Sequence, residues 1–309
     1  MFVRVLGAAA GGGFPQWNCH CTGCKRARAG DPAVKPRTQA SLAVSADGRR
    51  WVLLNASPDL PAQLRAARVL HPDHSGPARN SPVQAVVISG GDIDCIAGLL
   101  SLREGHSFAL YADPFVRKIL DDNEVFSVLN RDAVRYDSLA AQGETELRDA
   151  HDASLGLWAE AFAVPGKIPL YQEVGKDAGT LVHDQAVIGL SLRDSAGRKA
   201  FFIPGCARVT DEIRARVSGD NVLFFDGTLW QDDEMVVAGM GTKTGTRMGH
   251  ISVSGAKGSI AAFAETPLAR KIFIHINNTN PILCDDSQEA AFVRAAGWDI
   301  AFDGMEVTV

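Results

Sequence analysis

The chain has 309 residues, of which 46% are hydrophobic, and a formal net charge of −5 at pH 7. This composition allows a large buried core, while the acidic balance, with a pI near 5.9, argues against a broad nucleic-acid-binding surface. No segment reaches the roughly 18 apolar residues of a membrane span, and the N-terminal residues lack the basic and apolar regions of a signal peptide. We therefore expect a cytoplasmic protein.

Short runs rich in β-branched residues alternate with helical patterns along the chain. In the first half, we predict strands at residues 2–7, 41–46, 50–56, 84–89 and 108–112, and helices at 59–68, 95–103 and 114–120. Asp59 is expected to cap the first of these helices. In the second half, we predict strands at 158–164, 186–192, 199–205, 221–227, 270–276 and near 298–304, and helices at 210–217, 253–265 and 287–297.

The order of these elements indicates the fold class. Groups of strands followed by helices occur twice, which suits an α/β arrangement of two sheets packed face to face with helices outside. A single doubly wound sheet is the alternative. We expect one domain over residues 1–309, in which the polar, weakly periodic residues 113–158 are a candidate insertion.

Three cysteines lie within six residues, in the motif "CHCTGC". Cys19, Cys21 and Cys24 would supply three thiolates to a tetrahedral zinc ion, so one ligand must come from elsewhere. We leave that fourth ligand open between His20, which lies between the thiols, and Asn278 or its neighbours. Three reduced, unliganded cysteines are the alternative interpretation.

Carboxylates and imidazoles follow several predicted strands. Asp92 and Asp94 stand in "GGDIDC", Asp226 in "FFDGT" and His275 in "HINNTNP", while His250 precedes a helix. Together they have the composition of a mononuclear iron, manganese or zinc site, although strand-end aspartates and asparagines are also common caps and turn residues.

Arg103 ends the predicted helix "LLSLREG" beside a glutamate. A salt-bridged helix terminus is the simpler interpretation of this pair. Arg103 is nevertheless a candidate for binding an acidic substrate, since a guanidinium group pairs well with carboxylates.

Several long motifs resemble the PqqB family of pyrroloquinoline quinone (PQQ) biosynthesis. They are "GAAAGGGFPQWNCHCTGC", "LLNASPDL", "GLLSLREG", "DGTLWQDDEM", "GTKTGTRMGH" and "HINNTNPIL". The resemblance runs from the first strand to "FDGMEV", so it covers essentially the whole chain. It implies a metallo-β-lactamase-type αββα four-layer sandwich.

The resemblance also shows where this chain departs from its superfamily, which usually carries H-x-H-x-D-H after a core strand. Gly90 and Asp92 take the places of the two leading histidines, Asp94 the aspartate position and Cys95 the last histidine. PqqB proteins generally retain histidine at the place of Cys95. A further departure is Lys167, which replaces the histidine of the superfamily's "PGH" turn. Two metals need more ligands than remain, so a single metal is expected.

The resemblance implies a function in PQQ biosynthesis. We expect an Fe²⁺-dependent oxygenase, or one using another single divalent metal, that hydroxylates the tyrosine-derived ring of a PQQ precursor. The expected active-site ligands are Asp92, Asp94, Cys95 and His275, with His250 and Asp226 as catalytic residues. A carrier that assists transport of PQQ or its precursor to the periplasm is one alternative, and a residual metallo-hydrolase is another. The expected partners are PQQ or its precursor, with other PQQ-biosynthesis proteins as candidates, and neither nucleic acid nor membrane.

Overall fold

The computed structural model describes residues 1–140, 142–169 and 182–309. Within this part of the chain, two seven-stranded sheets pack face to face. None of its helices is long and apolar enough to cross a membrane.

The first sheet comes mostly from the first half of the chain. Its strand order is β14 (Glu306–Thr308), β1 (Phe2–Gly7), β2 (Ser41–Ser45), β3 (Trp51–Leu54), β4 (Val83–Val87), β5 (Phe108–Ala112) and β6 (Val134–Ser138). The pairs from β14 to β3 are antiparallel, whereas those from β3 to β6 are parallel.

The second sheet, like the first, has a parallel part and an antiparallel part. Its order is β13 (Asp299–Ile300), β12 (Leu268–Ile274), β11 (Gly219–Asp226), β10 (Lys199–Ile203), β9 (Val182–Asp194), β8 (Ser154–Lys167) and β7 (Thr145–Arg148). The pairs from β13 to β10 are parallel, and those from β10 to β7 are antiparallel.

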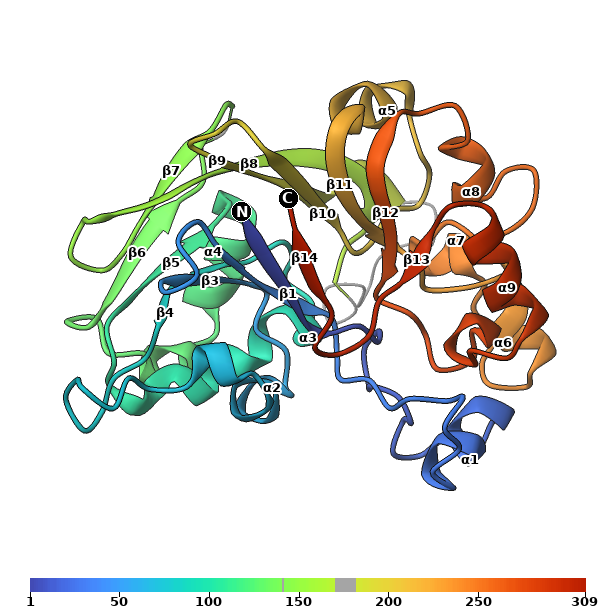
Figure 1. Cartoon of the computed structure of the whole chain (residues 1–309), viewed down its shortest axis with the longest axis horizontal. Coiled ribbons are helices and arrows are strands. Elements are labelled where there is room, and N and C mark those ends of the chain that lie inside the picture. The colour runs from blue at the N-terminus through green and yellow to red at the C-terminus, as the bar shows by residue number, and fades with distance from the viewer. Residues whose placement is uncertain (141, 170–181) are drawn as a thin grey trace.

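Helices lie outside the two sheets, as Figure 1 shows. They are α1 (Thr22–Arg28), α2 (Leu60–Ala66), α3 (Ile93–Ile96), α4 (Pro114–Asp122), α5 (Asp211–Val217), α6 (Glu234–Val237), α7 (Gly245–Met248), α8 (Ser259–Ala262) and α9 (Gln288–Ala295). Buried residues of α2 to α4 belong to the hydrophobic cluster outside the first sheet, and those of α1, α5 and α9 belong to the cluster outside the second.

The alternation of side chains along the strands explains these layers. In β10, Phe202 belongs to the core between the sheets, whereas its neighbours Phe201 and Ile203 pack under the outer helices. A strand that is buried on both faces reads as a continuous apolar run. The metallo-β-lactamase-type αββα sandwich expected from the sequence is therefore confirmed.

Several local predictions differ from the structure. In residues 113–158, the candidate insertion, β6 extends the first sheet and β7 pairs with β8 in the second, so the chain crosses between the sheets here. Asp59 precedes α2 without capping it, because its carboxylate accepts hydrogen bonds from the backbone and side-chain amides of Gln39.

Two predicted helices are shorter than expected. After α3, residues 97–104 form a 3₁₀-helix, and Gly98 comes so close to the preceding loop that a Cβ there would lie 2.1 Å from the carbonyl oxygen of Ser57. Of residues 253–265, only Ser259–Ala262 are helical, since Gly255 has a left-handed backbone (φ +85°) that interrupts the pattern.

Candidate functional site

A cavity of about 760 Å³ lies where parallel strands of both sheets end. The carboxyl ends of parallel strands meet at one edge of a sheet, which is where α/β-type sites usually form. Loops after β3, β4, β5, β10, β11 and β12 supply Asn55, Asp94, Asp113, Gly205, Thr228 and His275 to its wall. The N-terminal loop and the α6–α7 segment close it with Gly11, Gln16, Met235, Lys243, Met248 and His250.

Asp94 and His275 form a buried pair in this cavity. Asp94 Oδ2 and His275 Nε2 lie 3.0 Å apart although the residues are 181 positions apart in the chain. Burial opposes the charge of Asp94, but the hydrogen bond from His275 outweighs it and lowers the pKa of the carboxyl group. Burial likewise disfavours the imidazolium, yet Asp94 raises the pKa of His275.

His275 has an uncommon backbone conformation for a residue other than glycine. Its φ is +57°, in the left-handed region, where histidine, asparagine and aspartate are more frequent than other side chains. Thr228 stabilises it, because its hydroxyl lies 2.9 Å from the His275 carbonyl oxygen. Asn55, also in the cavity wall, has a similar backbone (φ +64°).

Asp226 is fully buried at the end of β11 and does not line the cavity. Its Oδ2 accepts from Cys206 N at 2.9 Å and lies 2.8 Å from His250 Nδ1. Its Oδ1 accepts from the backbone N–H and the hydroxyl of Thr228, at 3.0 Å and 2.6 Å. The carboxylate is therefore occupied by protein donors.

The imidazoles of His250 and His275 lie side by side, stacked with their centroids 5.3 Å apart and an interplanar angle of 20°. With Asp226 they form one of two groups of mutually close metal-ligating side chains in the described residues, their ligand atoms lying within 4.8 Å of one another. His250 and Asp226, predicted as catalytic residues, thus meet the predicted ligand His275.

Asp92 and Cys95 line the same cavity but do not belong to that group. Asp92 precedes α3, and Cys95 lies in its single turn. Burial raises the pKa of the Cys95 thiol, and the neighbouring carboxylates of Asp94 and Asp92 act in the same direction. Without a metal, Cys95 is therefore a neutral thiol.

The donors at the cavity fit a single divalent metal. Asp94 Oδ2 and His275 Nε2 face each other at hydrogen-bonding distance, and oxygen and imidazole ligands are suited to iron, manganese or zinc. Asp92 and Cys95 stand beside them as further donors in the cavity wall.

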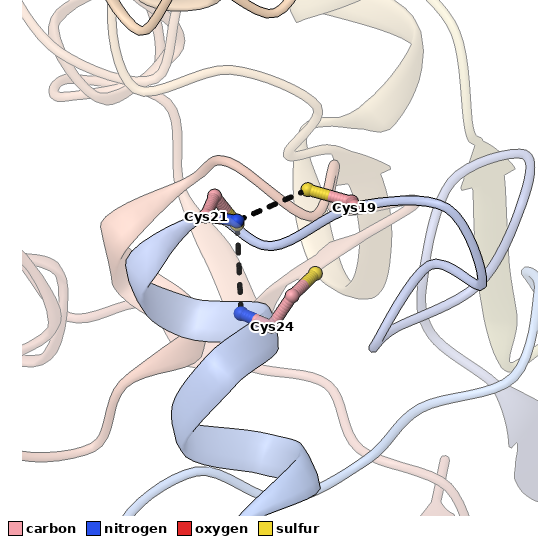
Figure 2. Close-up of side chains that lie close together, drawn as sticks. All are labelled: Cys19, Cys21 and Cys24. Atoms are coloured by element: carbon pink, nitrogen blue, oxygen red, sulfur yellow. Dashed lines mark hydrogen bonds between the residues drawn. The ribbon is translucent and has the colours of Figure 1, made fainter.

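The three cysteines of "CHCTGC" come together as the second group of close ligand atoms, with their sulfurs within 4.8 Å of one another. Figure 2 shows Cys21 immediately before α1, its backbone N–H donating to Cys19 Sγ and its own sulfur accepting from Cys24 N. Burial raises the pKa of the Cys24 thiol to about 12. Three converging sulfurs are a suitable donor set for structural zinc.

Asn278 reaches this cluster from the turn after β12. Its side-chain amide nitrogen lies 3.0 Å from Cys19 Sγ and 3.6 Å from Cys24 Sγ. The Cys21 thiol contacts the Asn278 carbonyl oxygen at 3.4 Å. His20 is exposed and outside the group. Of the two candidates for the fourth zinc ligand, the structure brings only Asn278 to the thiols.

Arg103 is not among the residues that line the cavity. Its guanidinium donates to the carbonyl of Leu100 at 3.0 Å and approaches Glu104 at 3.7 Å. The arginine ends a helix that packs on the first sheet, so it is a paired helix terminus and the substrate-binding prediction gains no support.

Sequence reasoning missed Thr228, whose hydroxyl contacts Asp226 and both histidines. The only signal for it is its position two residues after Asp226 in "FFDGT". It also missed Lys243, which lines the cavity from the segment between α6 and α7.

Comparison with known proteins gives consistent matches. The family model of the beta-lactamase superfamily domain matches residues 50–276. The "Coenzyme PQQ synthesis protein B" of Gluconacetobacter diazotrophicus is 51% identical over 98% of both chains, and that of Xanthomonas campestris pv. campestris is 47% identical over 100% of both.

Solved structures agree with these matches. The Zn²⁺-bound PqqB of Methylobacterium extorquens has a TM-score of 0.93 and 46% identity, with 100% of both chains covered. A diphosphatase of the PhnP family has a TM-score of 0.66 at 19% identity, covering 100% of this chain and 97% of its own, which indicates a shared fold alone.

Proposed function

This chain belongs to the coenzyme PQQ synthesis protein B family, and we infer from this membership that it takes part in the biosynthesis of PQQ. We further propose that it is a metal-dependent oxygenase that hydroxylates the tyrosine-derived ring of a PQQ precursor. The observation that carries this proposal is the pair of Asp94 and His275, which face each other across 3.0 Å in the cavity.

The number of donors favours an oxygenase over a hydrolase. Asp94 and His275 would hold the metal, with Asp92 or Cys95 as an additional ligand from the same loop. A single Fe²⁺ there would supply redox chemistry with dioxygen, and so few protein ligands leave positions for oxygen and substrate. Hydrolysis in this fold usually relies on two metals, which this donor set does not suit.

The remaining cavity residues have roles that follow from their chemistry. Lys167 and Lys243 line the cavity, and their ammonium groups favour a substrate with carboxylates. The cavity volume of about 760 Å³ falls within the ~300–1,000 Å³ range of small-molecule sites. His250, held through Nδ1 by Asp226, has its other ring nitrogen available to exchange a proton with the substrate.

Oxygen uptake by the protein loaded anaerobically with Fe²⁺ tests this function. An external two-electron reductant is supplied, because hydroxylation places one oxygen atom on the ring and the other must be reduced to water. We expect oxygen to be consumed in step with hydroxylated precursor, and His275→Ala to abolish both. Precursor turnover without oxygen would instead identify a hydrolase. Tight binding of PQQ by metal-free protein, with no turnover under any condition, would identify a carrier.

A further inference from the structure

We propose that Asn55 is a substrate-binding residue of the cavity, whose side-chain amide donates a hydrogen bond to an oxygen atom on the ring of the substrate. Asn55 stands in the motif "LLNASPDL", directly after β3, and it lines the cavity although only 2% of the residue is exposed. The proposal rests on the proposed function for the class of substrate, an aromatic precursor that carries carboxylates.

The hydrogen bonds of Asn55 determine which way its amide group points. Its Oδ1 accepts from the backbone N–H of Ser89 at 2.9 Å and from the Ser89 hydroxyl at 3.0 Å. A backbone N–H can only donate, so the side-chain atom that faces it must be the oxygen. The NH₂ group of Asn55 therefore lies on the side away from this N–H. The oxygen stabilises the fold, and the nitrogen can bind a different partner.

The NH₂ group of Asn55 faces the cavity. No protein group in the described parts of the chain accepts a hydrogen bond from Nδ2. This nitrogen is also not among the polar atoms that are buried without a partner, so it keeps contact with the cavity that Asn55 lines. A few fixed polar groups in a largely apolar cavity orient the ligand. Asn55 is such a group, and its donor requires an acceptor atom on the ligand.

The backbone holds this amide in place beside the proposed metal ligands. Asn55 has a left-handed backbone (φ +64°), which asparagine and aspartate adopt more readily than most residues. Its N–H donates to the carbonyl of Val87 at 2.9 Å, and the N–H of Ala56 donates to the carbonyl of Cys95 at 2.7 Å. Asn55 is thereby joined to β4 and to the loop that carries Asp94. A ring oxygen bound to Asn55 lies at the end of the cavity formed by this loop.

The cationic residues of the cavity come from the other sheet. Lys167 ends β8, and Lys243 lies between α6 and α7, after β11. Asn55 follows a strand of the first sheet. A substrate with its carboxylates at the lysines and its ring oxygen at Asn55 spans the cavity from one sheet to the other. The lysines select for charge, whereas the neutral amide distinguishes a ring that carries an oxygen from one that does not.

Aspartate is the matched replacement for Asn55. It keeps an oxygen for both donors of Ser89 and tolerates the left-handed backbone, but a second acceptor replaces the NH₂ donor. Asn55→Asp therefore preserves the structural hydrogen bonds and reverses the group that faces the ligand. Asn55→Gly is the second variant, because glycine adopts this backbone conformation without strain and removes the side chain altogether.

Calorimetric titration of the full-length protein with two planar acids tests the proposal. The acids are 9-fluorenone-2-carboxylate and fluorene-2-carboxylate, which differ in that a ring carbonyl of the first is a CH₂ group in the second. Wild type should bind the ketone ~3–10-fold more tightly, as expected for one hydrogen bond between neutral groups. Asn55→Asp should lose this preference, because the ketone oxygen then meets a carboxylate. The added charge weakens both acids alike, so the ratio of their dissociation constants reports the hydrogen bond.

Two further variants complete the test. Asn55→Gly should also bind both acids equally, and it covers the case in which Asn55→Asp does not fold. Lys167→Met is the matched control, which should weaken both acids and keep the preference for the ketone. Equal affinities in wild type, binding of neither acid, a preference that persists without the Asn55 amide, or its loss in Lys167→Met would overturn the proposal.

These measurements are independent of the proposed reaction. They use neither iron nor turnover, and the binding ratio does not depend on oxygen. A protein that prefers the ketone through Asn55 but consumes no oxygen would contradict the proposed oxygenase and leave the role of Asn55 standing. Oxygen consumption without any preference between the two acids would contradict the role of Asn55 alone.

Discussion

Replacing Cys21 with serine separates two roles of one sulfur atom. Cys21 Sγ is one of three converging thiols, and it also caps α1 by accepting from Cys24 N at 3.5 Å. Serine is among the best helix N-caps but a poor zinc ligand, since zinc sites of this kind use thiolates. Cys21→Ser therefore removes the metal ligand and keeps the cap, whereas Cys21→Ala removes both.

The magnitudes follow from these two roles. Zinc present at 100 times its dissociation constant stabilises the folded protein by about 2.7 kcal/mol, and the free energy of unfolding of Cys21→Ser should lack that contribution. Losing the cap as well should cost Cys21→Ala about 1 kcal/mol more. Urea denaturation with and without a chelator measures both quantities. Wild type should be weakened by the chelator, and both variants should be nearly insensitive to it.

Elemental analysis supplies the decisive comparison. We expect Cys21→Ser to hold one zinc fewer per chain than wild type. His20→Ala is the matched control, because His20 is the exposed neighbour outside the thiol group, and its zinc content should be unchanged. An unaltered zinc content in Cys21→Ser, together with an undiminished response to the chelator, would show that the cysteines are ordinary reduced thiols.

Three further predictions concern single positions. Cys95→His should raise Fe²⁺ affinity and oxygen consumption, because imidazole replaces a thiol whose pKa burial raises; equal activity of wild type, Cys95→His and Cys95→Ala would make Cys95 a packing residue. Burial raises the pKa of Asp303 to about 6, above its unfolded value near ~3.9, so its contribution to stability is present at low pH and is lost as pH rises through 6. Relative to Asp303→Asn, wild type should lose about 2 kcal/mol of unfolding free energy between pH 4 and 7, which urea titrations at both pH values measure; a constant difference would refute this. Arg103→Ala should leave the KM for the precursor unchanged, and a severalfold rise would restore its substrate-binding role.

The sequence predicts most strands because their signal is local. β10 and β11 are short apolar runs with Phe on both faces, a pattern that a buried parallel strand requires. The short helices are harder to predict, because tertiary contacts decide them. Gly98 is an example, because the loop at Ser57 comes close to it, and the residues next to Gly98 in the sequence do not predict that contact.

The cysteine cluster and the cavity site also differ in whether neighbouring residues or tertiary contacts bring their side chains together. The three cysteines lie within six residues, so their spacing alone predicts that their sulfurs can meet. Asp94 and His275 are 181 positions apart, and only the common exit of parallel strands suggests that they approach. The contacts of Thr228 with Asp226 and both histidines depend on distances among four side chains, for which a threonine two residues after Asp226 is no signal in itself.

The turn after β12 connects the two candidate metal sites. His275 begins it at the cavity, and three residues later the amide of Asn278 lies 3.0 Å from Cys19 Sγ. Asn280 closes the turn by donating to the carbonyl of Gly227, next to Thr228, at 2.9 Å. A left-handed residue such as His275 keeps its conformation only when its surroundings hold it. Because the cysteine cluster is one of those surroundings, loss of zinc in Cys21→Ser should also weaken Fe²⁺ binding at the cavity, although Cys21 lines no part of it.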